Sequence, residues 1–279
     1  MQSDSASMGF RCLGFLLLLF LTQANASVGH YSTSLQNEFS VSWAADHVNF
    51  LRGGQELQLK LDQNSGSGFT SKKKYLFGNI SMQIKLVPGD SAGTVTAYYL
   101  SSEGVNHDEL DFEFLGNKSG EPYVLQTNVY ASGKGDREQR IYLWFDPTKD
   151  FHSYGVLWTP QHILFMVDGV PIRVFKNNKA VGVPYPESQA MGVYSSLWNG
   201  DSWATQGGLV KIDWSHAPFV AAYRNFQAHN SFNERYQTDM LSPAEKKKLW
   251  WVKKNYMIYD YCNDKQRYPV PPPECTINL

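Results

Sequence analysis

The sequence predicts an all-β protein, a jelly-roll β-sandwich with a concave cleft and a short C-terminal extension that contains a helix. Two observations carry this prediction. Short segments that alternate apolar and polar residues recur along most of the chain, as is typical of half-buried strands. The one clear helix-start signature comes near the C-terminus. Many strands at short spacing favour a jelly roll in which one sheet forms a concave face.

The predicted strands follow one another at short intervals. In chain order they are residues 56–61, 80–86, 94–100, 107–116, 123–130, 140–145, 154–158, 163–167, 172–175, 191–198 and 219–226. The Asp168-Gly169 pair between two of them is typical of a two-residue hairpin turn.

The helix is predicted over about residues 243–256. Ser242 at the N-cap, Pro243 at the first helical position and Glu245 form a capping box. The lysine run that follows is interpreted as a solvated face rather than a polyanion site, because an apolar side accompanies it. That side consists of Leu249, Trp250, Val252 and Tyr256.

Composition indicates a neutral partner. The formal net charge is −1, so the chain has no strong field to attract nucleic acid or anionic lipid. It contains 8 Trp, 16 Tyr and 16 Phe. Flat aromatic side chains suit the apolar CH faces of sugar rings, although most of them are expected in the core.

The N-terminus is typical of a secretory signal peptide. Arg11 precedes an apolar run over residues 13–21, and Ala24-Asn25-Ala26 supplies the small residues of a cleavage site. The run is too short to span a membrane. We expect residues 1–26 to be removed and the mature chain to have no membrane association. Of the cysteines, this leaves Cys262 and Cys275, which predict one disulfide, with two free buried thiols as the alternative.

Residues 107–116 hold the most informative pattern, because acidic and apolar side chains alternate there. In a strand, Glu109, Asp111 and Glu113 share one face, and the apolar residues between them face the core. Three carboxyls on one face repel each other, which costs stability. The arrangement makes sense if two of them act on a bound substrate and the third tunes their pKa values.

The spacing of these acids suits one reaction. The Cα atoms of Glu109 and Glu113 are expected about 13 Å apart along a strand. A retaining glycosidase needs its two carboxyl groups about 5–5.5 Å apart, a gap that leaning side chains on a concave sheet close. The alternative is a solvated acidic strand face. It is disfavoured because glycine, aromatic and amide residues surround the strand, instead of lysine or arginine.

The chain resembles the xyloglucan endotransglucosylase/hydrolase family of plant cell walls, within glycoside hydrolase family 16. The resemblance runs from about residue 39 to residue 275, with the acidic strand and further blocks in family order. These blocks are Tyr75-Leu-Phe-Gly78, Leu86-Val-Pro-Gly-Asp-Ser-Ala-Gly93, Gln126-Thr-Asn-Val-Tyr130, Leu143-Trp-Phe-Asp-Pro147 and Tyr259-Asp-Tyr-Cys262.

The resemblance implies a mechanism and a substrate. Glu109 is the implied nucleophile, Asp111 the assisting carboxylate and Glu113 the acid/base of a double displacement. Xyloglucan is the implied donor and acceptor, with cleavage at its β-1,4-glucan backbone, in the cell wall and apoplast. We expect a monomer, and catalysis by two carboxylates needs no metal and no cofactor. A predominantly hydrolytic xyloglucanase and a non-catalytic polysaccharide-binding jelly roll are the alternatives.

Further residues are expected to contact substrate. Gln126 and Asn128 lie on one strand face and suit sugar hydroxyls, with a structural amide pair as the alternative. Trp203 is interpreted as a loop platform for a sugar ring, whereas a buried core position suits Trp198 better. The set that the resemblance implies is Gln126, Thr127, Asn128, Asp136, Arg137, Glu138, Ser202, Trp203, Gly207 and Arg267. Ser202 departs from the family, which usually has Asp at this position. The short turn at residues 133–138 resembles the transferase type.

The remaining predictions concern modification and domain organisation. Asn117 begins a glycosylation sequon in a turn, and resemblance supports its use, whereas the sequon at Asn79 lies inside a predicted strand. We divide the mature chain into a catalytic jelly roll, residues 27–228, and an extension, residues 229–279, that the disulfide pins. The second cysteine pair that family members commonly carry is absent here.

Overall fold

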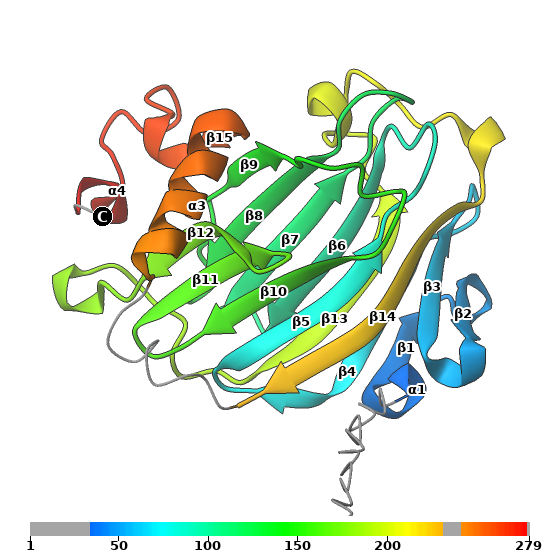
Figure 1. The fold of residues 1–279 in the computed structure, drawn as a ribbon, viewed down its shortest axis with the longest axis horizontal. Helices are drawn as coiled ribbons and strands as arrows, with labels where there is room; N and C mark the ends of the chain where they lie inside the picture. Colours follow the sequence, from blue (N-terminus) through cyan, green and yellow to red (C-terminus); the bar gives the residue numbers. More distant parts are fainter. Residues whose placement is uncertain (1–33, 231–240, 278–279) are drawn as a thin grey trace, which may run out of the picture. The chain divides into compact units, whose positions relative to one another are not determined.

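The computed structural model describes residues 34–230 and 241–277, so the predicted signal peptide lies outside the described residues. Two antiparallel sheets face each other (Figure 1). The first has the order β1 (Phe39–Trp43), β4 (Ser67–Tyr75), β13 (Met191–Asn199), β6 (Thr94–Ser101), β7 (Glu109–Leu115), β8 (Val124–Tyr130), β9 (Gln139–Tyr142) and β15 (Met257–Asp260). The second has the order β12 (Val170–Lys176), β11 (His162–Val167), β10 (His152–Trp158), β5 (Gly78–Lys85), β14 (Phe219–His229), β3 (Glu56–Leu61) and β2 (Val48–Leu51).

Short helices connect and flank the sheets. The α-helices described are α1 (Leu35–Glu38), α3 (Pro243–Asn255) and α4 (Pro273–Thr276). One-turn 3-10 helices span Ala45–His47, Arg52–Gly54, Lys179–Val181, Thr205–Gly208, Trp214–His216 and Tyr261–Asn263. No helix within residues 34–230 and 241–277 is both long and apolar enough to cross a bilayer.

The core lies between the two sheets, and β7 contributes its apolar half. Leu110, Phe112 and Phe114 are fully buried. Phe112 meets Phe165 of β11 at a ring distance of 5.3 Å, and Phe114 meets Tyr154 of β10 at 4.6 Å. The predicted alternation on this strand is therefore confirmed, and its acidic half is left on the opposite face of the sheet.

Most of the predicted strands are confirmed, but β1, β2, β4 and β15 were not predicted. Strand β4 was missed because its glycine, its serines and its three consecutive lysines interrupt the alternation of apolar and polar residues. Those lysines are exposed, and Lys74 pairs with Glu103 at 3.0 Å. The Asp168-Gly169 hairpin is confirmed, with φ values of 49° and 69° that both lie in the left-handed region.

The strand predicted over residues 140–145 ends three residues early. The backbone N–H of Tyr142 donates to the carbonyl of Tyr256 at 2.9 Å, beyond the end of α3. Trp144 then leaves the sheet and packs against Trp251 of α3, with ring centroids 5.5 Å apart. Aromatic packing against the helix therefore replaces continuation of the strand.

The C-terminal extension joins the first sheet. The capping box of α3 is confirmed, since Ser242 and Glu245 exchange hydrogen bonds. Helix α3, in orange in Figure 1, packs against β12 and β15. Val252 is buried there, but Trp250 is 59% exposed, so the prediction that Trp250 belongs to the apolar side of this helix that packs against the protein is wrong. Strand β15 pairs with β9, and the predicted disulfide joins Cys262 to Cys275.

Candidate active site

A cleft of about 450 Å³ lies on the face of the first sheet that carries the acids. Strands β6, β7, β8, β9 and β13 supply most of its lining. The lining residues are Ala97, Tyr99, Glu109, Asp111, Glu113, Gln126, Asn128, Tyr130, Glu138, Arg140, Ser196, Trp198 and Trp203. The three predicted catalytic carboxyls therefore line one cavity, together with both predicted amides.

Strand register determines which side chains surround each acid. On β8, Tyr130 lies opposite Glu109, Asn128 opposite Asp111, and Gln126 opposite Glu113. Directly opposed residues on neighbouring strands project from the same side of the sheet. The alternation that places the acids in the cleft thus also places an aromatic ring and two amides beside them.

Asp111 is the most buried of the three acids. It is 6% exposed and hydrogen-bonded to Glu109. Burial raises the pKa of Asp111 well above its usual value, and the neighbouring charges of Glu109 and Glu113 raise it further. The buried Arg173 opposes this shift without cancelling it. These effects favour a protonated Asp111 that donates to Glu109.

Glu113 has a raised pKa with a different set of partners. Burial is the main cause, and the charge of Glu109 adds to it. Gln126 works in the opposite direction, because its Nε2 donates a short hydrogen bond to Oε2 of Glu113. A carboxyl that keeps its proton in a cleft is suited to general acid catalysis.

Glu109 has a histidine, His107, as a neighbour. Oε2 of Glu109 is 3.8 Å from Nε2 of His107, whose ring stacks on Tyr130 with centroids 5.3 Å apart. Sequence reasoning did not assign a role to His107 or Tyr130. Tyr130 could have been found, because it continues the alternation of Gln126 and Asn128 on the same strand face.

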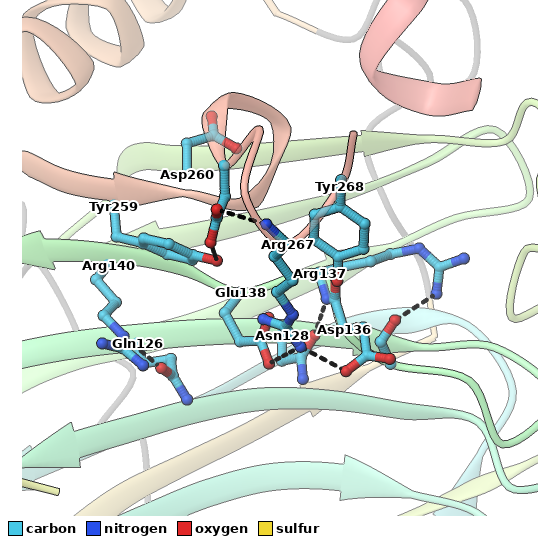
Figure 2. Close-up of polar contacts among 12 residues, drawn as sticks. Gln126, Asn128, Asp136, Arg137, Glu138, Arg140, Tyr259, Asp260, Arg267 and Tyr268 are labelled. Carbon is cyan, nitrogen blue, oxygen red and sulfur yellow. Dashed lines mark hydrogen bonds and ion pairs between the residues drawn. The ribbon is translucent and has the colours of Figure 1, made fainter. Parts of the chain in front are cut away.

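Arg267 ties the extension to the turn at residues 133–138 (Figure 2). It donates to Oδ1 of Asp136 at 2.6 Å and to Oε2 of Glu138 at 2.7 Å. The hydroxyl of Tyr268 donates to the backbone carbonyl of Asp136 at 2.7 Å. Glu138 lines the cleft, so this cluster lies at its edge. The predicted residues Asp136, Glu138 and Arg267 are therefore brought together, although only Glu138 is in the lining.

The structure does not bring Thr127 and Arg137 into the cleft, which corrects their predicted contact with substrate. Thr127 is 3% exposed and faces the core, where Arg173 donates to its hydroxyl at 3.1 Å. The side chain of Arg137 is 8% exposed and forms an ion pair with Glu274 at 2.6 Å. Arg137 contacts a residue of the cleft lining only through its backbone N–H, which donates to Oδ1 of Asn128 at 3.0 Å.

The loop after β13 places one of its three predicted residues in the cleft. Trp203 lines the cavity beside Trp198, with ring centroids 6.2 Å apart. Trp198 is half-buried and also packs against a small buried cluster, so the core position expected for it is confirmed only in part. Ser202 and Gly207 are exposed and do not belong to the lining. Gly207 has φ of 67°, and a side chain there would meet open space.

The sequon residue Asn117 lies just past the end of β7. Its side chain is half-buried, and Nδ2 donates to the carbonyl of Pro122 at 3.1 Å. A separate hollow of about 430 Å³ is lined by residues 117–123 and 145–149, together with Gly89. Asn79 lies within β5, as predicted.

Comparison with known proteins agrees with this fold. Residues 35–216 match the model of glycosyl hydrolases family 16, and residues 227–275 match that of the xyloglucan endo-transglycosylase C-terminus. Among solved structures, a Bacillus licheniformis β-glucanase is 26% identical, with a TM-score of 0.55 over 72% of this chain and 89% of that chain. The Crh5 transglycosylase is 25% identical, with a TM-score of 0.59 over 72% and 82% of the two chains.

Sequence relatives narrow the class. Xyloglucan endotransglucosylase/hydrolase 2 of Glycine max is 54% identical over 94% of this chain and 95% of the relative. Xyloglucan endotransglucosylase protein 1 of Diospyros kaki is 53% identical over 96% and 95%. The chain therefore belongs to glycosyl hydrolase family 16 and, within it, to the xyloglucan endotransglucosylase/hydrolases.

Proposed function

We propose that this enzyme cleaves the β-1,4-glucan backbone of xyloglucan and transfers the released glycosyl chain to another xyloglucan molecule. The observation that carries the proposal is the face of β7, where Glu109, Asp111 and Glu113 line one cleft. Family membership and the names of the relatives support the choice of xyloglucan.

In the first step, Glu109 acts as the nucleophile and Glu113 as the acid. The carboxylate of Glu109 attacks the anomeric carbon, and the glycosidic bond breaks as Glu113 gives its proton to the leaving oxygen. A covalent glycosyl-enzyme and a shortened chain with a new hydroxyl result. Asp111, hydrogen-bonded to Glu109, orients the nucleophile and adjusts its charge as the ester forms.

In the second step, Glu113 acts as the base. It takes the proton of an acceptor hydroxyl, which attacks the anomeric carbon and releases Glu109. A sugar acceptor gives transfer, and water gives hydrolysis. Water is far more abundant, so transfer requires an acceptor that is bound and oriented. The short turn at residues 133–138, held by Arg267 and Tyr268, supports this outcome over the hydrolytic alternative.

We further propose a secreted monomer of the plant cell wall and apoplast. Cleavage after Ala26, glycosylation at Asn117 and the Cys262–Cys275 disulfide fit an extracellular route. The proposed jelly roll spans residues 27–228 and the extension residues 229–279. The start of the C-terminal family match at residue 227 supports this division.

One assay tests the function. The secreted protein is incubated with xyloglucan, with and without labelled xyloglucan oligosaccharides, and polymer size and label are followed together. We expect label to enter polymer while the average chain length falls, with little new reducing end. New reducing ends without incorporation would favour the hydrolytic alternative. Binding without any change of chain length would favour the non-catalytic one.

A further inference from the structure

The side-chain amide of Gln126 has a fixed orientation, because its two neighbours require opposite ends of it. Nε of Arg140 donates to Oε1 of Gln126 at 2.7 Å, and a guanidinium has no acceptor to offer. The Nε2 group of Gln126 must therefore face Glu113, where it donates to Oε2. Figure 2 shows Arg140 close to both Gln126 and Tyr259.

This orientation determines which oxygen of Glu113 carries the proton. Oε2 accepts a hydrogen bond from Gln126, so the acid form holds its proton on Oε1. The same hydrogen bond lowers the pKa of Glu113, as does the charge of Arg140. Burial has the larger effect and raises the pKa, and the charges of Glu109 and Glu138 raise it further. If the amide turned over, its carbonyl would accept a hydrogen bond from protonated Glu113. This bond would hold the proton away from the leaving oxygen and raise the pKa of Glu113.

Arg140 is in turn held by the C-terminal extension. In the pairing of β9 with β15, Tyr259 lies directly opposite Arg140. The guanidinium carbon is 5.3 Å from the centroid of the Tyr259 ring, within the range of a cation–π contact. The Tyr259 hydroxyl donates to Oδ2 of Asp264 at 2.9 Å, which anchors the ring. Two side chains thus connect the extension to the amide beside Glu113.

We propose that Arg140 is a positioning residue that locks Gln126 so that its amide only donates to Glu113, and that Tyr259 keeps Arg140 in place. The proposal rests on the acid/base role proposed above for Glu113. It gives the extension a part in placing the catalytic proton, in addition to its place at the edge of the cleft.

The matched pair Arg140→Lys and Arg140→Gln tests the lock. Lysine, like arginine, can only donate, whereas glutamine offers a donor and an acceptor and releases the lock. We expect Arg140→Gln to lower kcat/KM for transfer by about tenfold, less than the about 10²–10⁴-fold typical of general acid–base catalysis. The alkaline limb of its pH profile should move to higher pH, and Arg140→Lys should restore it. An unmoved limb in Arg140→Gln, or equal shifts in both variants, would overturn the proposal.

A double-mutant cycle separates the lock from the charge of Arg140. In a Gln126→Met background no amide remains to orient, so adding Arg140→Gln should move the alkaline limb by less than it does in the unmutated background, because only the charge of Arg140, which lowers the pKa of Glu113, is then lost. A further shift of the same size as in the unmutated background would mean that Arg140 acts through charge alone. Tyr259→Leu should shift the limb in the same direction as Arg140→Gln, while Tyr259→Phe, which keeps the ring but loses its hydrogen bond to Asp264, should shift it less.

Glu113→Ala distinguishes failure of the lock from failure of the acid/base assignment. Assayed with an aryl glycoside whose leaving group needs no proton, this variant should lose the alkaline limb. If the limb persists, Glu113 is not the acid, and the proposal loses its basis. If the limb is lost but Arg140→Gln behaves like the unmutated enzyme, the lock alone is wrong. Thermal denaturation of each variant verifies that it is folded.

Discussion

Three carboxyls of the same strand face behave differently because their neighbours differ. Asp111 is almost fully buried between two other acids, which favours its protonated form. Glu113 combines burial with a donor, Gln126, that limits the rise of its pKa. Glu109 has the hydrogen bond to Asp111 and the nearby His107 ring. One strand thereby carries the proposed nucleophile, the proposed helper and the proposed acid.

Asp111→Asn should separate stability from activity. Because the folded-state pKa of Asp111 is raised above 3.8, its contribution to stability is complete below that pH and is lost as pH rises through the raised value. Asparagine does not titrate, so the variant does not lose stability in this way as the pH rises. We expect a higher melting temperature than that of the unmutated protein at neutral pH, a difference that shrinks toward acidic pH, and a severe loss of transfer.

Thermal denaturation across the pH range and the pH–rate profile check this expectation. An unchanged rate with an unchanged profile would leave Asp111 a structural role only. A variant less stable than the unmutated protein at neutral pH would contradict the account of its burial.

At the residue scale, sequence reasoning succeeded where a local rule applied. The period of two along a strand was enough to place Glu109, Asp111 and Glu113 on one face, and Gln126 and Asn128 beside them. It failed for Arg137, whose partner Glu274 is 137 positions away in the sequence. No local pattern indicates such a contact, and the substrate contact expected for Arg137 rested on the family resemblance instead.

At the scale of elements, β15 is the unpredicted strand that matters most for the site. It is a strand of four residues, Met257–Asp260, and its aromatic and acidic residues do not alternate with clear polarity. Its pairing with β9 places Tyr259 opposite Arg140. By contrast, the start of α3 was predictable because a capping box is a local signature.

Loss of the disulfide should affect acceptor use more than bond cleavage. The bridge closes a loop that contains Arg267 and Tyr268, which hold the turn at Asp136. Chain-entropy estimates give about 3 kcal/mol for a loop of this size. We expect the variant with both Cys262→Ser and Cys275→Ser to be less stable and to show a lower ratio of transfer to hydrolysis, because a loose acceptor side orients the hydroxyl poorly.

Quantifying both products on this double variant decides the matter, with the unmutated protein as control. Glycosyl-enzyme formation should persist, since Glu109 and Glu113 lie on β7, which β8 and β9 separate from β15, the strand that precedes the bridge. A ratio equal to that of the control, or intact-mass data showing two free thiols in the native protein, would count against the idea.

At the scale of residues 34–230 and 241–277 together, the strand with the three acids and the C-terminal extension share one sheet. The order β7-β8-β9-β15 runs from the acids to the extension. The second sheet supports it through Arg173 of β12, which donates across the core to the carbonyl of Thr127 at 2.9 Å. The sandwich class followed from alternation, but this order depends on pairings between distant segments, which local patterns do not encode.

The central claim is that a glycosyl chain is carried on Glu109 and passed to a sugar acceptor. The most direct measurement is rapid denaturation of the enzyme during reaction with a xyloglucan oligosaccharide donor, followed by intact-mass and peptide mass spectrometry. We predict an adduct of the glycosyl mass on the peptide that contains Glu109, its disappearance when an acceptor oligosaccharide is added before denaturation, and its absence in Glu109→Gln. An adduct on another residue, or turnover by Glu109→Gln at the rate of the unmutated enzyme, would contradict the account.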